Sequence, residues 1–333
     1  MTFNQSQYIT DALDGFVLQQ TGFPYVCMIV DDASTEGEPD VIRRYLNENF
    51  DWEEADEAFD KEEDFGQILF ARHKANQNCY FAVILLKENH YSQRKNKLAY
   101  FEGWLDAKYI ALCEGDDYWT DPLKLQKQVD YLETHPGCLL TVHAADWKTG
   151  EDIYPYGCMD AESKDYSVDD LIQVGGFYFA TASFVFRSEL DDDWPEWRQN
   201  ARVGDYPLQI LAGLRGTVHF MSDKMCVYRY QRAGSWSYRW QKENATNIAY
   251  QKNKIEWMTL LDESTAHKYQ GVIYDQLFPN FNSLFNLGEV GFRTYARAAG
   301  RMRNKRYGRV LKDGIHYLFT RFHRKPWDVT KRS

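Results

Sequence analysis

The stretch Cys113-Glu114-Gly115-Asp116-Asp117-Tyr118-Trp119 places three carboxylates directly after a short, mostly apolar run at residues 108–112. That run is typical of a buried strand, and the following Thr120-Asp121-Pro122 is typical of the start of a helix. Open α/β sheets bind ligands at the carboxyl ends of their strands, and Mg²⁺ is commonly held by one or two carboxylates together with substrate phosphates. The stretch therefore predicts a metal–diphosphate site, although by itself it fits a helix cap with spare acids equally well.

A second apolar run, residues 25–30, ends in the same way at Asp31 and Asp32. Turn residues follow, and then a helical pattern over residues 41–46. We expect two parallel strands of one sheet whose acidic ends converge on one ligand. The sequence carries neither the Gly-x-Gly-x-x-Gly turn of dinucleotide-binding folds nor the Gly-Lys-Ser/Thr loop of P-loop enzymes, which argues against both classes.

The order and spacing of these motifs resemble those of the family 2 glycosyltransferases of bacterial surface-polysaccharide type. Val-Asp-Asp-Ala-Ser-Thr at residues 30–35 and Glu-Gly-Asp-Asp-Tyr-Trp at residues 114–119 carry the resemblance. Residues 1–5 resemble the family's opening Thr-Tyr-Asn segment, with Phe3 in place of tyrosine, and residues 228–237 resemble the segment that closes its site. The similarity covers about residues 1–240. It implies an α/β protein with the inverting GT-A fold, a Rossmann-like mixed sheet flanked by helices.

The resemblance also implies roles for individual residues. Asp117, with Asp116, is implied as ligand of Mn²⁺ or Mg²⁺, and Asp205 in the motif at residues 203–208 as the general base for the acceptor hydroxyl. From the sequence alone, Asp205 could instead cap a helix. Glu114 stands where the family carries aspartate. The implied nucleotide-sugar contacts are Thr2, Phe3, Asp31, Asp32, Asp116, Arg229 and Arg232.

The function that follows is transfer of a sugar from a nucleotide diphosphate sugar, expected to be a UDP-sugar, to a hydroxyl of a glycan or lipid-linked glycan in cell-surface polysaccharide synthesis. Two alternatives stay open. One is a degenerate, non-catalytic protein that binds nucleotide sugar or glycan, because Met1 falls where the family's first strand would be finishing and that strand is expected to be truncated. The other is a sugar nucleotidyltransferase, which should show a Gly-rich basic phosphate loop near the N-terminus; none is seen.

Length and composition agree with one large α/β domain, residues 1–240, followed by an extension, residues 241–333. The six cysteines lack metal-ligand spacing and are typical of a reducing compartment. No secretory leader opens the chain, and no apolar stretch approaches the ~20 residues that span a bilayer. These features predict a cytoplasmic protein.

The extension, residues 241–333, has a helical pattern and is basic at its end. Residues 291–333 carry thirteen Lys or Arg against two acids, a net +11, while the whole chain carries −10, so residues 1–290 carry −21. A basic tail with interleaved aromatics is expected to do one of two things. It either lies on the anionic inner face of the cell membrane, where each Lys or Arg contributes roughly 1 kcal/mol of binding free energy, or it neutralises the acidic domain. No nucleic-acid recognition motif accompanies the charge, and no nucleic-acid partner is expected.

Between the motifs, several elements are predicted by local pattern. Residues 48–64 hold ten acids against one lysine and are expected to form a solvated helix or loop insertion. Residues 67–72 and 79–86 are expected to form a β-hairpin, and residues 123–133 a helix. Residues 146–170 are expected to be a loop, and residues 181–186 a strand.

Overall fold

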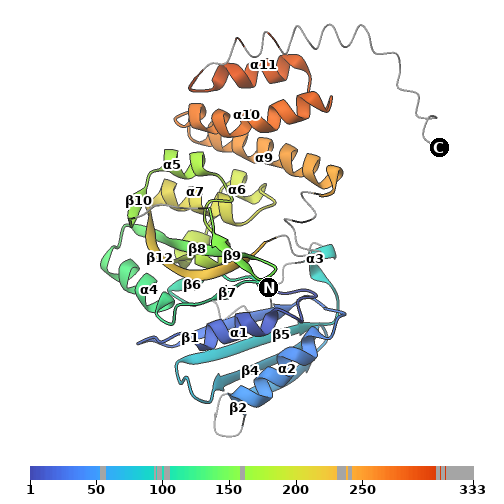
Figure 1. The fold of residues 1–333 in the computed structure, drawn as a ribbon, viewed down its shortest axis with the longest axis vertical. Coiled ribbons are helices and arrows are strands. Elements are labelled where there is room, and N and C mark those ends of the chain that lie inside the picture. Colours follow the sequence, from blue (N-terminus) through green and yellow to red (C-terminus); the bar gives the residue numbers. More distant parts are fainter. Residues whose placement is uncertain are drawn as a thin grey trace, which may run out of the picture. The chain divides into compact units, whose positions relative to one another are not determined.

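The structure is a computed structural model of the chain and describes residues 1–52, 58–93, 95, 100, 106–157, 162–230, 238, 242–304, 308 and 312. Two compact units make up the chain. The first comprises residues 1–167, 176–193 and 208–237, and the second comprises residues 168–175, 194–207 and 238–333. Figure 1 gives the order of the elements along the chain. The functional division expected near residue 240 stays a prediction.

The first sheet of the first unit has the strand order β1-β5-β4-β2. β1 (Tyr25–Asp31) runs parallel to β5 (Cys79–Leu86), and β5 is antiparallel to β4 (Gly66–His73). The hairpin predicted from residues 67–72 and 79–86 is thereby confirmed. Alternate residues of β5 enter different apolar clusters, because successive side chains of a strand point to opposite faces. Helices α1 (Ile9–Val17) and α2 (Glu38–Asn49) pack on one of these faces (Figure 1).

The acidic segment forms strands where a helix or loop is expected. β2 (Phe50–Asp51) and β3 (Phe59–Glu63) both pair with β4. The acids of β3 are exposed, as expected for a solvated segment, but the backbone is held as an edge strand. Charged side chains on an edge strand discourage pairing with other chains, so a charge run is no evidence against a strand. Residues 53–57 lie outside the described residues.

The second sheet of the first unit has the order β10-β12-β8-β11-β6, with β7 paired to β12 and β9 to β8. Its long strands β8 (Cys138–Thr149) and β12 (Thr217–Arg229) are parallel. The short ones are β6 (Tyr109–Ala111), β7 (Tyr118–Trp119), β9 (Asp152–Pro155), β10 (Lys164–Tyr166) and β11 (Val185–Arg187). Helix α4 (Lys124–Thr134) confirms the helix predicted from residue 123, and packs against this sheet.

Three expectations for this sheet are wrong. β6, which leads to the 113–119 stretch, lies in a different sheet from β1 and pairs antiparallel with β11, so the two acidic strand ends do not belong to one sheet. Residues 146–170 are not a loop throughout, because β8 continues to Thr149 and β9 and β10 are short, mostly exposed edge strands. Residues 181–183 form a 3₁₀ turn, and only β11 continues as strand.

The remaining elements are short or helical. In the first unit these are α3 (His90–Gln93) and the 3₁₀ turn Ser188–Asp191. Helix α7 (Asp205–Arg215) begins in the residues of the second unit. The other helices of the second unit are α5 (Val168–Val174), α6 (Glu196–Gln199), α9 (Asn244–Ser264), α10 (Gln270–Asn286) and α11 (Phe292–Arg301). The helical pattern expected after residue 241 is confirmed for the described part.

Aromatic side chains pack together in the core of the second unit. The ring of Trp257 lies 6.1 Å from that of Trp197 and 5.4 Å from that of Tyr206. Within the described ranges, no helix combines the length and the apolar character that a membrane span requires.

Candidate functional site

The N-terminal segment lies beside the acidic end of β1. The Thr2 N–H donates to the carbonyl of Val30 at 2.9 Å, and the Asp32 N–H donates to the carbonyl of Thr2 at 3.0 Å. These bonds make Thr2 a parallel bridge partner of Asp31. Thr2 is buried, whereas the Phe3 side chain is 44% exposed.

A buried glutamate that the sequence analysis did not single out fixes this segment. Glu38, in the first turn of α2, accepts hydrogen bonds from the Thr2 hydroxyl, from the Gln5 N–H at 2.8 Å and from the Ser34 hydroxyl at 2.8 Å. An ionised carboxylate is an acceptor only, which suits a position surrounded by donors. In the sequence, Glu38 is only an acid beside Pro39 in the first turn of a helix. Many helices begin in this way without taking part in a functional site.

Asp31 keeps one carboxylate oxygen without a partner. Its side chain is buried, Oδ1 accepts the Ser34 N–H at 3.0 Å, and Oδ2 has no hydrogen-bond partner among the described residues. Burial raises the pKa of Asp31, and the negative charges of Glu38 and Asp32 add to the rise against the lowering effect of Ser34. An oxygen of this kind is poised to bind a donor or a cation.

Asp32 orders the loop that follows β5. Its two carboxylate oxygens accept the N–H groups of His90 at 2.7 Å and Tyr91 at 3.0 Å, and its carbonyl accepts the Asn89 amide at 2.9 Å. This arrangement is an N-terminal cap of α3. The nucleotide contact implied for Asp32 therefore stays a prediction beside an observed structural role.

The 113–117 loop packs directly on the N-terminal segment. The Gly115 N–H donates to the carbonyl of Met1 at 3.3 Å, and a Cβ added at Gly115 would lie only 2.5 Å from the Thr2 hydroxyl oxygen and 2.8 Å from its Cβ. Only glycine fits this approach. Thr2 thus contacts both acidic segments, so the structure brings them together although their strands belong to different sheets.

Asp117 is the most deeply buried of the predicted metal ligands. Its side chain has no exposed surface, Oδ1 accepts the Arg229 N–H at 2.9 Å, and Oδ2 has no partner in the described part of the chain. Burial raises its pKa well above the usual range, and the charges of Asp116 and Glu114 raise it further. Asp116, directly before it, is half-buried.

Arg229 ties this acidic loop to β12. Its Nη1 donates to the carbonyl of Asp116 at 2.5 Å, and its guanidinium forms an ion pair with Asp11 of α1. The guanidinium carbon also lies 4.5 Å from the ring centre of Tyr118. The side chain implied as a phosphate contact is therefore already engaged by protein groups. Arg232 lies outside the described residues.

The donor set fits a hard divalent cation. A cation at Asp117 would give the buried Oδ2 a partner and would favour the ionised carboxylate that burial disfavours. The described residues form no group of three or more His, Cys, Asp or Glu able to hold a metal by themselves. One or two carboxylates suit Mn²⁺ or Mg²⁺ when substrate oxygens complete the coordination.

Asp205, the implied general base, belongs to the residues of the second unit. It is the first residue of α7, is half-buried, and its Oδ1 accepts the N–H of Tyr206 at 2.8 Å. These contacts match those of an acid at the start of a helix. The catalytic role of Asp205 stays a prediction.

A buried lysine lies in the helix that follows the acidic loop. Lys124 has no exposed surface, and its Nζ donates to Gln128 Oε1 at 2.8 Å and lies 4.3 Å from the ring centre of Trp119. Burial lowers its pKa to about 8. The sequence pattern placed residue 124 in a helix but gave no sign that its charge would be buried.

An aromatic row crosses β9, β8 and β12. Tyr154 pairs with Trp147, and Trp147 pairs with Tyr228, so the three side chains share one face of the sheet. The Trp147 ring lies 6.0 Å from that of Tyr154 and 4.5 Å from that of Tyr230. Tyr228 and Tyr230 flank Arg229, so the row lies at the carboxyl ends of the parallel strands β8 and β12.

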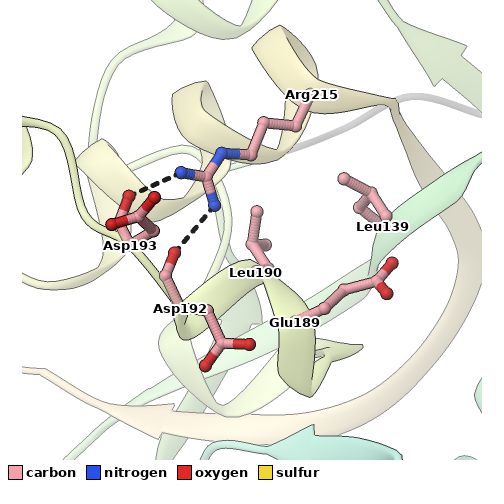
Figure 2. A pocket seen from close by; sticks show the side chains of 6 residues that line it. All are labelled: Leu139, Glu189, Leu190, Asp192, Asp193 and Arg215. Atoms are coloured by element: carbon pink, nitrogen blue, oxygen red, sulfur yellow. Dashed lines mark hydrogen bonds between the residues drawn. The ribbon is translucent and has the colours of Figure 1, made fainter.

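Figure 2 shows a separate cleft in the first unit, with a volume of about 430 Å³. Arg215 donates to the carbonyls of Asp192 at 2.9 Å and Asp193 at 2.7 Å, as the dashed lines mark. Leu139, in its lining, stands at the beginning of β8, at the opposite end of the strand from Trp147. The full lining is Leu139, Glu189, Leu190, Asp192, Asp193 and Arg215, and it contains none of the strand-end acids.

Comparisons with known proteins give relatives without an assigned activity. No protein-family model matches the sequence. Uncharacterized proteins of Mycobacterium bovis and of two strains of Mycobacterium tuberculosis are 34% identical over 245 residues, which is 71% of this chain. The chain covers 59% of the length of each of these relatives.

Among solved structures, a mannosyltransferase of Pyrobaculum calidifontis in complex with GDP-Man and Mn²⁺ is similar over 96% of this chain and 85% of that chain. The TM-score is 0.47 and the sequence identity is 13%. A similarity of this extent assigns neither an activity nor a donor to the chain.

Proposed function

We propose that the chain is a metal-dependent, inverting glycosyltransferase of family 2 and GT-A type. It transfers a sugar from a nucleotide diphosphate sugar, expected to be a UDP-sugar, to a hydroxyl of a glycan or lipid-linked glycan in cell-surface polysaccharide synthesis. One observation carries the proposal. Asp31 and Asp117 belong to segments that both pack on Thr2, and each keeps a buried carboxylate oxygen without a partner in the described residues.

Donor binding is assigned to the residues around Thr2. Ribose hydroxyls and base N–H groups are hydrogen-bond donors, and an ionised carboxylate only accepts. The free Oδ2 of Asp31 supplies such an acceptor at the end of β1. Phe3, which follows Thr2 in the chain and is 44% exposed, offers a flat face for the base.

Asp117, assisted by Asp116, is assigned to hold the cation. When bound, Mn²⁺ or Mg²⁺ would supply Lewis-acid stabilisation for the departing diphosphate. Arg229 keeps the two acids in place through its N–H to Asp117 Oδ1 and its Nη1 to the Asp116 carbonyl. Asp205 takes the proton of the acceptor hydroxyl in this proposal, on the strength of the sequence motif around it.

The aromatic row supports a carbohydrate acceptor. Trp147, Tyr154 and Tyr228 offer flat faces on which sugar rings can stack, and the two tyrosines carry hydroxyl groups that can hydrogen-bond to sugars. Tyr154 is 47% exposed. The row ends at Tyr228, directly before Arg229 in β12, and its side chains lie on the opposite face of the sheet from that of Arg229, which shares its face with Lys148 and Ile153. The row is proposed as an acceptor surface at the carboxyl ends of β8 and β12.

Donor hydrolysis tests the proposal. Purified protein is incubated with a panel of nucleotide sugars, and release of nucleoside diphosphate is measured with Mn²⁺, with Mg²⁺ and with chelator. We expect metal-dependent release that falls at least a hundredfold in Asp117→Asn. The matched control is Asp223→Asn, which removes an exposed charge 3.2 Å from Lys127 and should leave release unchanged.

The alternatives give different results in the same assay. Nucleotide-sugar binding without release from any donor would indicate the non-catalytic protein. Pyrophosphate release from a nucleoside triphosphate and a sugar phosphate would indicate a nucleotidyltransferase. Release of nucleoside diphosphate that is unchanged by metal and by Asp117→Asn would contradict the proposed mechanism.

The acceptor assignment has its own test. Trp147→Ala is expected to weaken binding to glycans on an array at least tenfold while leaving donor hydrolysis intact. Ile153→Ala is the matched control, because Ile153 lies on the same hairpin with its side chain on the other face of the strand. Equal glycan binding by the two variants would remove the aromatic row from the acceptor site.

A further inference from the structure

Helix α11 has two chemically different faces. Its buried face carries Tyr295, Ala298 and Ala299, and the Tyr295 ring packs on α10, 4.7 Å from the ring of Phe285. Its exposed face carries Arg293 and Arg297, and Arg301 continues the row at the same four-residue spacing. Residues spaced by four lie on one side of a helix, so α11 presents a row of three arginines to solvent.

This arginine row, defined as Arg293, Arg297 and Arg301, is not neutralised by the described residues of its unit. Arg293 and Arg297 form no ion pair with any described residue, and Arg301 contacts the ring and the hydroxyl of Tyr274 rather than a carboxylate. In a chain whose first 290 residues carry −21, an unpaired basic row is a local exception. It marks a surface suited to an anionic partner.

The sequence after α11 extends the same character. Residues 302–333 add ten Lys or Arg against two acids, and apolar residues are interleaved among them: Ile315, Tyr317, Leu318, Phe319, Phe322 and Trp327. Bases interleaved with bulky apolar residues are typical of segments that lie at a lipid–water interface. A nucleic-acid partner would not call for this apolar content, and no nucleic-acid recognition motif is present.

We propose that the arginine row of α11 docks on a membrane surface that contains anionic phospholipids. Each planar guanidinium can bind a lipid phosphate through two parallel hydrogen bonds. The buried face of α11 remains packed on α10, so docking requires no unfolding of the second unit. The proposal concerns where the protein works and does not depend on the glycosyltransferase assignment.

Vesicle cosedimentation tests the docking surface. The full chain is mixed with vesicles of phosphatidylcholine alone or of phosphatidylcholine with phosphatidylglycerol, at low and at high salt. We expect binding only to the anionic vesicles, with a loss of binding as salt rises, because screening weakens surface charge interactions. Arg293→Glu/Arg297→Glu is expected to reduce the partition coefficient at least tenfold.

The matched control is Lys61→Glu/Lys242→Glu, which changes the net charge equally at two exposed positions outside the row. It should bind nearly as well as the wild type. Circular dichroism and donor hydrolysis in solution are measured for both variants, and Arg293→Gln/Arg297→Gln replaces the reversal if folding is impaired. The proposal is overturned if the wild type does not bind anionic vesicles, or if the arginine and the lysine double variants lose binding equally. It is also overturned if the protein binds duplex DNA in preference to vesicles.

Discussion

The backbone N–H of Arg229 donates to Asp117 Oδ1 at 2.9 Å, while the side chain of the same arginine donates to the Asp116 carbonyl at 2.5 Å. One residue of β12 therefore fixes both acids of the 113–119 stretch. Asp11 of α1 forms an ion pair with this guanidinium, which is mostly buried, with 10% of the side chain exposed. The position of the acidic loop thus depends on contacts with residues far apart in the sequence.

Removing the partner of Arg229 should loosen this arrangement. In Asp11→Asn the guanidinium loses its carboxylate and Asp116 loses a rigid anchor, so we expect donor turnover to fall about tenfold while the fold is kept. Asp14→Asn is the control on the same helix. Among the described residues the Asp14 side chain accepts the Tyr45 hydroxyl at 2.7 Å, and asparagine can still accept it. Steady-state kinetics of donor turnover make the comparison. Equal turnover rates in the two variants would show that the ion pair does not position the acids.

The close packing of Gly115 on Thr2 predicts a strong effect of one added methyl. In Gly115→Ala the new Cβ would overlap Thr2, and relieving that overlap should cost roughly 1–3 kcal/mol of unfolding free energy. Gly137→Ala is the matched control, because a Cβ there meets no atom of the described residues within 4 Å. Urea denaturation of the two variants gives the comparison, and similar midpoints would contradict the observed contact.

The buried Glu38 should support stability as well as the site. In Glu38→Ala the Gln5 N–H and the Ser34 hydroxyl lose their acceptor, and an unsatisfied buried donor costs about 1–3 kcal/mol. Glu36→Ala, two residues away and exposed, should change the free energy of unfolding little. We expect Glu38→Ala also to weaken nucleotide binding, because Thr2 loses its anchor; a fully stable Glu38→Ala protein would argue against this network.

The lowered pKa of Lys124 predicts a pH dependence of stability. The native pKa is about 8 against 10.5 ordinarily, so above pH 8 the unfolded state binds more protons than the native state and stability rises with pH. Between pH 7 and 9 this group should add about 1 kcal/mol to the free energy of unfolding. Lys124→Met cannot titrate, so the difference between the wild type and this variant isolates the effect, and a pH-independent difference would contradict it.

Sequence patterns identified the elements whose signals are local. The apolar runs at residues 25–30 and 79–86 are confirmed as strands. Nearly all of β5 is buried, whereas in β1 only the last residues are buried. The acids at the end of β1 and after β6 stand out in the sequence because they interrupt apolar runs, although Asp31, Asp32 and Asp117 are themselves buried. The edge strands β3, β9 and β10 were missed because they are short and mostly exposed, and none of them contains a long apolar run.

The assembly of the site rests on contacts that no local pattern contains. A three-residue run such as β6 does not reveal which sheet it joins, and the expectation of a single sheet was wrong for that reason. Thr2, Asp31 and Gly115 meet through contacts over about a hundred residues of sequence. The burial of Lys124 and the role of Glu38 follow from that same packing, so neither could be predicted from its neighbours in the chain.

Calorimetric titration of nucleoside diphosphates into the protein, with and without Mn²⁺, tests the central claim most directly. If Asp31 and Asp117 serve one cation-bound nucleotide, the wild type should bind at least one nucleoside diphosphate only in the presence of Mn²⁺. Asp31→Asn and Asp117→Asn should each lose that binding, and Asp223→Asn should retain it. Binding that persists without metal, or that survives in both Asp31→Asn and Asp117→Asn, would contradict the account.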